Sequence, residues 1–176
     1  MPYTHCIAAP TRKLQSCRTT HYRKMIGAPV QKRVNNHQFM QEIRRLFNQE
    51  GKKSVTFIVR GFSMHPFLEH GRDKVILAPP RTPKIGDVVL AEIAERRYAL
   101  HRVISIKDGI YTMQGDGNPN RMKERFTEEK IVGVADGFIR KGRRVMTNSR
   151  RWRVYSAAWK LLKPFRRILL AIFRRM

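Results

Sequence analysis

Residues 84–114, KIGDVVLAEIAERRYALHRVISIKDGIYTMQ, decide the fold that the sequence predicts. A turn introduces the apolar run 88–93, and the runs 98–106 and 110–114 are separated by the turn residues Lys107-Asp108-Gly109. An Asp-Gly turn between two apolar runs of this length is typical of a β-hairpin. The stretch therefore predicts consecutive antiparallel strands.

The same pattern extends on both sides of this stretch. Short runs rich in β-branched residues occur at 55–60, 74–78 and 131–135, and the last continues to 138–139. No helical pattern separates these five or six predicted strands. Strands that follow one another in this way indicate an antiparallel sheet system or a small coiled barrel.

A short helix is predicted before the strands, from Asn35-Asn36 to Asn48, with Gly51 as its stop. Its apolar residues recur at helical spacing. They are Phe39, Met40, Ile43 and Phe47. We expect this helix to pack on the core of the domain.

The last segment, residues 152–176, predicts a basic amphipathic helix that is interrupted near Pro164. Its apolar side carries Tyr155, Trp159, Leu162, Phe165, Leu169, Ile172 and Phe173. Its basic side carries Arg153, Lys160, Lys163, Arg167, Arg174 and Arg175. Such a helix suits peripheral contact with an anionic membrane, and docking of its apolar side on the domain is the alternative.

The charge of the chain is concentrated in its two ends. The 176 residues carry 37 Lys and Arg against 13 Asp and Glu, a net charge of +24. Residues 1–53 hold 11 basic and 2 acidic groups, residues 54–142 hold 15 and 11, and residues 143–176 hold 11 and none. The middle is thus nearly balanced, which argues against a folded nucleic-acid cleft and for basic tails.

These observations predict one domain with tails: a disordered basic tail at 1–34, a folded domain with its leading helix at 35–142, and a basic amphipathic segment at 143–176. The longest apolar runs are shorter than the roughly 18 to 20 residues of a spanning helix, and no secretory signal is visible. Cys6 and Cys17 support neither a disulfide framework nor a zinc site. We expect no metal, no cofactor and a reducing compartment.

Three motifs of the middle domain place reactive groups beside turn or glycine residues: 61–66 (GFSMHP), 100–104 (LHRVI) and 115–118 (GDGN). A serine hydroxyl needs a base, an imidazole is the usual base near neutral pH, and a carboxylate can orient that imidazole. Backbone N–H groups of Ser63 and Met64 can supply part of an oxyanion hole. Each motif also has a structural interpretation, as a cap, a packed side chain or a tight turn.

Residues 55–142 resemble the catalytic domain of type I signal peptidases and their relatives in the signal-peptidase and SOS-repressor superfamily. Five motifs in the family's order carry the resemblance. They are Gly61-x-Ser63-Met64-x-Pro66 with Gly71-x-Asp73, then Lys84-x-Gly86-Asp87-Val88-Val89, His101-Arg102-Val103-Ile104, Gly115-Asp116-x-Asn118 and Ile131-Val132-Gly133. The resemblance implies a mainly β fold, a coiled antiparallel β-sheet domain of signal-peptidase type.

The resemblance also implies site residues. Ser63 is the implied nucleophile, and His101 stands where bacterial enzymes of the family place a lysine base, which resembles the reticulum-type and archaeal branch. Asp116 is the candidate orienting carboxylate. The reticulum-type enzymes carry further aspartates after this box, whereas residues 119–124 (PNRMKE) offer only Glu124, so the third member stays open. The family's membrane-spanning anchor is missing, and the basic C-terminal segment is a candidate surface substitute.

Other polar residues near these motifs are expected to be structural. Asp73 and Asp87 are predicted to hold turns and loop hydrogen bonds. Arg102 falls on the opposite face from His101 in a regular strand, which makes it a candidate for an ion pair. His65 and His70 are alternative bases, but their loop positions favour His101.

The sequence thus predicts a serine endopeptidase of signal-peptidase type that binds a peptide or leader segment in extended form and cleaves it through an acyl-enzyme. A catalytically silent or self-processing peptide-binding module of the same fold is the alternative, and a basic nucleic-acid-binding protein is a weaker one. The expected location is cytoplasmic or peripheral at the cytoplasmic membrane face, with no specific nucleic acid as partner.

Overall fold

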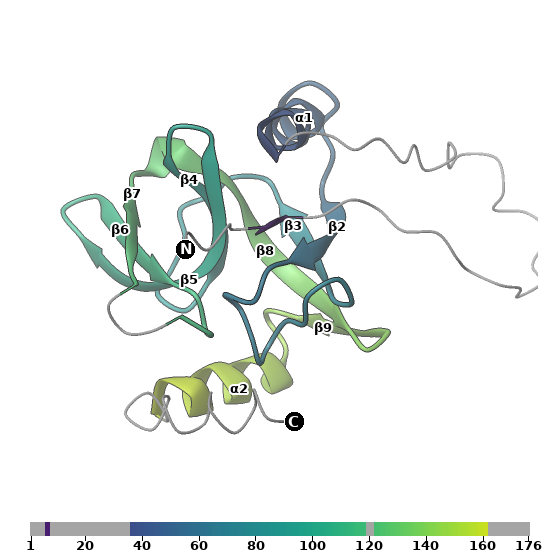
Figure 1. Ribbon diagram of the computed structural model, residues 1–176, viewed down its shortest axis with the longest axis vertical. Coiled ribbons are helices and arrows are strands. Elements are labelled where there is room, and N and C mark those ends of the chain that lie inside the picture. The colour runs from purple at the N-terminus through teal and green to yellow at the C-terminus, as the bar shows by residue number, and fades with distance from the viewer. Residues whose placement is uncertain (1–5, 8–35, 119–121, 162–176) are drawn as a thin grey trace, which may run out of the picture.

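The computed structural model describes residues 6–7, 36–118 and 122–161 of the chain (Figure 1). In these ranges the protein is mainly β, with one antiparallel sheet of eight strands, β2 to β9, that is not closed into a barrel. The strands are β1 (Cys6–Ile7), β2 (Val55–Arg60), β3 (Lys74–Ala78), β4 (Val88–Ala94), β5 (Arg97–Lys107), β6 (Ile110–Gln114), β7 (Glu124–Phe126), β8 (Ile131–Arg140) and β9 (Arg143–Met146). The helices are α1 (Asn36–Asn48), the single 3-10 turn η1 (Glu128–Lys130) and α2 (Arg150–Leu161).

The long strand β8 joins the two halves of the sheet. The strand order is β1-β2-β3-β8-β4-β5-β6-β7, and β9 pairs with the far end of β8. Figure 1 shows β4 to β7 on one side of β8 and β2, β3 and β9 on the other. The two-residue β1 lies on the outer edge of β2, where Ile7 is opposite Val59.

The central strands are buried on both faces. In β4, Val88 and Leu90 belong to one apolar cluster, whereas Val89 and Ala91 belong to a second one on the other face. Alternate residues of a strand point to opposite faces, so an uninterrupted apolar run is what a doubly covered strand requires. The same alternation governs β5 and places its residues 101 and 102 on opposite sides of the sheet.

Helix α1 covers the first cluster, as the sequence predicts. Met40, Ile43 and Phe47 are its buried residues. Phe39 meets the ring of Phe57 edge to face, with the centroids 5.5 Å apart. Gly51 follows with a φ of +57°, a left-handed conformation that favours glycine at a helix end.

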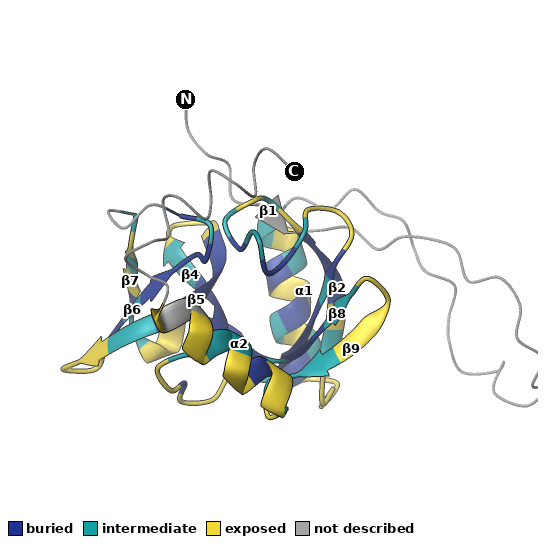
Figure 2. Cartoon of the chain, turned by 90° about the horizontal axis from the view of Figure 1, so that it is seen from below, coloured by how far each residue is buried: buried dark blue, intermediate teal, exposed yellow. Residues whose placement is uncertain are grey.

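Helix α2 docks on the domain through its aromatic residues. Trp152 is buried, and the ring of Phe67 lies 4.9 Å from that of Trp152 and 4.6 Å from that of Tyr155. Figure 2 shows the opposite side of the helix exposed. The first turns of α2 therefore dock on the domain through Trp152 and Tyr155. The side chains of positions 159 and 160 are not part of the description.

The predicted strands are confirmed, with ends that differ by at most one residue. A closed barrel is not formed. β7 and β9 were not predicted, and β9 extends the sheet to Met146, past the boundary placed at 142. The tail predicted at 1–34 lies outside the described residues, except for β1. The part of the C-terminal helix predicted beyond Leu161 also lies outside them. No helix in the described part of the chain is both long and apolar enough to cross a bilayer.

Candidate functional site

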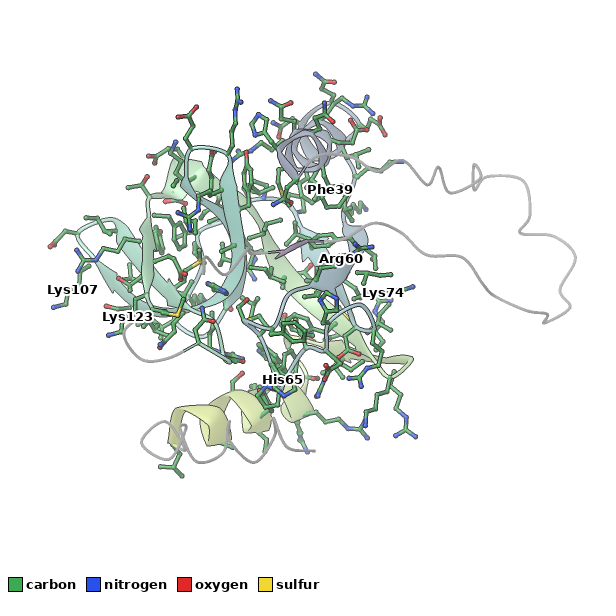
Figure 3. All side chains as sticks on the ribbon, viewed as in Figure 1. Phe39, Arg60, His65, Lys74, Lys107 and Lys123 are labelled. Atoms are coloured by element: carbon green, nitrogen blue, oxygen red, sulfur yellow. The ribbon has the colours of Figure 1, made fainter. Side chains whose placement is uncertain are left out.

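Ser63 lies in the loop that connects β2 to β3. Three buried side chains fix this loop to the core: Met64, Phe67 and Leu68. The N–H of Leu68 donates to the carbonyl of Met64 at 2.9 Å, which closes a turn directly after the serine. Ser63 itself is half-buried. Figure 3 places His65 of the same loop at the end of the molecule where α2 lies.

The backbone of Ser63 is held by a second turn, residues 115–118, which follows β6. The N–H of Gly117 donates to the carbonyl of Ser63 at 2.7 Å, and the N–H of Asn118 donates to the carbonyl of Gly115 at 3.1 Å. Among the residues that the structure describes, the backbone N–H groups of Ser63 and Met64 have no acceptor. These are the two groups that the sequence predicts for an oxyanion hole.

His101 is fully buried in β5 and is oriented by a carboxylate. Its Nδ1 lies 3.0 Å from Oε2 of Glu124, which the short strand β7 carries. The other ring nitrogen is close to the serine loop. A Cβ placed on Gly115 would lie 2.9 Å from Nε2 of His101 and 2.3 Å from the carbonyl oxygen of Ser63. These two atoms are therefore separated by no more than the sum of those distances.

Asp116 occupies a different place from the one expected of an orienting carboxylate. Its two oxygens accept hydrogen bonds from Nε and Nη2 of Arg102, at 2.9 and 2.7 Å, and the ion pair is buried. Burial lowers the pKa of Arg102, but the Asp116 carboxylate more than offsets this and leaves that pKa above its ordinary value. Glu124 takes the position at Nδ1 of His101, and the ion pair predicted for Arg102 is confirmed.

Asp73 and Asp87 hold turns, as the sequence predicts. Asp87 accepts from the N–H of Lys84 at 3.1 Å and from Arg81 at 3.0 Å. Asp73 is fully buried and accepts from Arg72 at 2.8 and 3.0 Å and from the N–H groups of residues 69 and 141. Within the described residues, neither carboxylate forms a hydrogen bond or an ion pair with Ser63 or His101.

The Asp73 carboxylate predicts a pH-dependent stability. Burial raises its pKa, but the hydrogen bonds from Arg72 and two backbone N–H groups outweigh burial and hold the pKa below its ordinary value. A carboxyl with a lowered folded-state pKa stabilises the fold fully above its unfolded value, near about 3.9, and loses this contribution as pH falls through the folded value. We expect the wild-type free energy of unfolding to fall faster than that of Asp73→Asn below about pH 4 in urea titrations. The exposed turn variant Asp108→Asn controls for the loss of one charge, and identical slopes in wild type and Asp73→Asn would contradict the assignment.

Gly115 is predicted to tolerate no side chain. Because a Cβ there would overlap the carbonyl of Ser63, Gly115→Ala must displace the serine loop or the turn. We expect a loss of about 1–3 kcal/mol in the free energy of unfolding, measured by urea denaturation. Gly109→Asn is the control, since that turn position has open space and a left-handed φ that asparagine accepts. Equal stability of wild type and Gly115→Ala would exclude this close approach.

The two other histidines near the serine have roles within the loop. Nδ1 of His70 accepts the N–H of Gly61 at 2.8 Å, and its ring stacks on Phe62. Nδ1 of His65 lies 3.4 Å from Oε2 of Glu69. Of the three histidines, His101 is the one whose ring lies beside Gly115, next to the backbone carbonyl of Ser63.

Two residues near the site had no role assigned from the sequence. Glu124 was noted only as the remaining carboxylate after the Gly-Asp box, and its pairing with His101 depends on β7, which was not predicted. Asn118 is buried, and its Nδ2 has no hydrogen-bond partner in the described ranges. Its position in the Gly115-Asp116-Gly117-Asn118 turn was the available signal for Asn118.

Further observations delimit the site. No group of three or more His, Cys, Asp or Glu residues in the described part of the chain is arranged to hold a metal ion. Comparison of the whole chain with protein-family models, with curated proteins and with solved structures finds no match in any of the three.

Proposed function

We propose that the protein is a serine endopeptidase of signal-peptidase type, with Ser63 as nucleophile and His101 as general base. One observation carries the proposal: the backbone of Ser63 and Nε2 of the buried His101 converge on Gly115, at a point that accommodates no side chain. A base that is oriented by a carboxylate at Nδ1 and reaches a serine hydroxyl with Nε2 can activate that hydroxyl, and the proximity of Nε2 to the Ser63 backbone supports this arrangement. The proposal includes the fold type: we propose that the antiparallel sheet is a coiled β-domain of signal-peptidase type.

The proposed reaction proceeds in two steps. The Oγ of Ser63 attacks the scissile carbonyl, and Nε2 of His101 takes the hydroxyl proton. The oxyanion of the tetrahedral intermediate accepts hydrogen bonds from the N–H groups of Ser63 and Met64. The imidazolium then gives its proton to the leaving amine, and a water activated by His101 hydrolyses the acyl-enzyme. In this scheme Glu124 orients the imidazole, in place of Asp116.

An extended peptide fits the edge of the strand that leads to Ser63. Main-chain pairing with an exposed edge is a common way to bind such a segment. The chain itself places an extended segment there, since Cys6 and Ile7 of β1 pair with Arg60 and Val59 of β2. In this proposal a substrate strand takes the place of β1 on the edge of β2, just before the serine loop.

We also propose peripheral contact with an anionic membrane at its cytoplasmic face. Val154 and Leu161 of α2 are 69% and 80% exposed, among the exposed arginines 150, 151 and 153. A cavity of about 500 Å³ beside the helix is lined by aromatic residues and cations, and no acidic residue follows Asp136 in the sequence. The cations of this cavity are Arg140, Lys141, Arg143 and Arg151. Apolar side chains among cations are typical of an interfacial surface.

Vesicle binding tests this contact. We expect co-sedimentation with vesicles that contain phosphatidylglycerol and little with pure phosphatidylcholine, because each cation near an anionic surface contributes about 1 kcal/mol. Arg151→Glu with Arg153→Glu should lower the partition coefficient at least about tenfold. Arg125→Glu, an exposed cation of β7, is the control. Equal binding to both vesicle types would overturn the proposal, and sequence-selective nucleic-acid binding at physiological salt would favour the nucleic-acid alternative.

Covalent labelling tests the peptidase. The folded protein is treated with a fluorophosphonate, and its mass and the modified peptide are determined. We expect one adduct, on Ser63, and none on heat-unfolded protein. A peptide library should then be cut after small residues. A folded protein that is neither labelled nor able to cleave would overturn the peptidase and leave the peptide-binding module.

A further inference from the structure

Helix α2 reaches the candidate site through the buried cation Arg102. The guanidinium carbon lies 4.7 Å from the ring centroid of Trp152 and 5.9 Å from that of Tyr155. Nη1 of Arg102 donates to Oγ of Ser156 at 3.0 Å and to the carbonyl of Gly86 at 3.0 Å. Three residues on one side of α2 therefore surround one guanidinium, through cation–π contacts and a hydrogen bond.

The other donors of Arg102 continue this connection toward the serine. Nε and Nη2 hold both oxygens of Asp116, which lies in the 115–118 turn. The next residue, Gly117, donates its N–H to the carbonyl of Ser63. The preceding residue, Gly115, separates that carbonyl from the imidazole of His101. The guanidinium thus fixes the turn that spaces the two reacting groups.

The helix also contacts the serine loop directly. Trp152 is 5% exposed and packs against Phe67, which follows Ser63 in the same loop, and against Phe138 of β8, each at 4.9 Å between ring centroids. A buried ring that is packed against Phe67, Phe138 and the guanidinium of Arg102 has little freedom to shift. Docking of α2 consequently constrains both the serine loop and the 115–118 turn that holds it.

We propose that α2 is a positioning element of the site, in which Trp152 and Ser156 act through Arg102 to hold the 115–118 turn against Ser63. This inference rests on the proposed function, because it concerns the reactivity of Ser63. Neither residue touches the reacting atoms. Loosening α2 slows acylation while the nucleophile, the base and the oxyanion donors all remain present.

The test uses the full chain and compares Trp152→Ala, Trp152→Phe and Ser156→Ala with Ala158→Ser, an exposed position of the same helix. Fluorophosphonate labelling of Ser63 is measured against probe concentration, which separates probe binding from the acylation rate. Hydrogen exchange of the Gly117 amide, bonded to Ser63, is compared with that of Lys52, bonded to Leu46 at the end of α1. A general loss of stability accelerates both amides, whereas loss of positioning accelerates Gly117 selectively.

We expect the maximal acylation rate to fall about threefold in Ser156→Ala, the loss of one hydrogen bond, and at least about tenfold in Trp152→Ala, with little change in probe affinity. Trp152→Phe should recover most of the rate, and Ala158→Ser should match wild type. Wild-type rates and wild-type Gly117 exchange in Ser156→Ala, or in a folded Trp152→Ala, would overturn the positioning role. If wild type is not labelled at all, the peptidase fails, and Gly117 exchange still decides whether α2 holds the turn.

Discussion

Replacement of Ser63 with alanine is expected to remove covalent labelling and to lower peptide cleavage by at least about 10³-fold, because the variant lacks the attacking oxygen. His101→Ala should lose about as much, since an unactivated hydroxyl is a poor nucleophile near neutral pH. The double variant should be no worse than either single one, because nucleophile and base act as a unit. Initial rates of cleavage of one fluorogenic peptide measure all three.

The controls separate chemistry from folding. Urea denaturation should show a cooperative transition for each variant. His65→Gln changes a histidine of the serine loop that, like His101, faces a carboxylate. This variant should keep most of the activity. Full activity of Ser63→Ala would contradict the assignment of the nucleophile, and activity lost in His65→Gln but kept in His101→Ala would assign the base to the loop instead.

The same assay distinguishes the two carboxylates. Glu124→Gln removes the charge that faces Nδ1 of His101, and a wrongly oriented or wrongly protonated imidazole costs about 10²- to 10⁴-fold in comparable triads. Asp116→Asn leaves that contact in place and acts on Arg102. We therefore expect Glu124→Gln to lower activity with little change in stability, and Asp116→Asn to lower stability as well. The reverse pattern would restore Asp116 as the orienting group.

Strand alternation explains why the sequence did not identify the carboxylate that faces His101. Positions 101 and 102 lie on opposite faces of β5, as expected from the period of two. Asp116, directly after β6, meets Arg102, so the partner of His101 comes from the other side of the sheet. That partner is on β7, three residues of mixed polarity that give no strand signal.

The sequence pattern also gave little indication of β9 or of the docking of α2. The apolar runs of β2 to β6 and β8 show period two or double burial, and these strands could be predicted. β9 begins with Arg143 and Arg144, so its charge indicated a tail, although its backbone pairs with β8. For α2, one apolar stripe is compatible with a membrane and with the domain. The contacts of Trp152 with Phe67 and Phe138 show that the first turns dock on the domain, and the stripe alone does not predict this.

The buried pair of Arg102 and Asp116 leads to the largest stability effect that we expect. Arg102→Met leaves Asp116 buried without its partner, and breaking such a pair costs about 3–5 kcal/mol in the free energy of unfolding. For a chain of this size, each kcal/mol lowers the Tm by about 2–4 °C. Thermal unfolding followed by circular dichroism measures the shift. A Tm within about 2 °C of wild type would show that the pair is not buried as described.

A double variant then separates the stability of this pair from its role at the site. Arg102→Met with Asp116→Leu replaces both charges with apolar groups, which often restores the stability that the single variant loses. The double variant still lacks the guanidinium that Ser156 and Trp152 surround, and it lacks the carboxylate that fixes the turn beside Ser63. We therefore expect the Tm to recover at least in part while the acylation rate stays low. If the rate recovers together with the Tm, the pair contributes to folding alone, and the turn reaches its position at Ser63 without it.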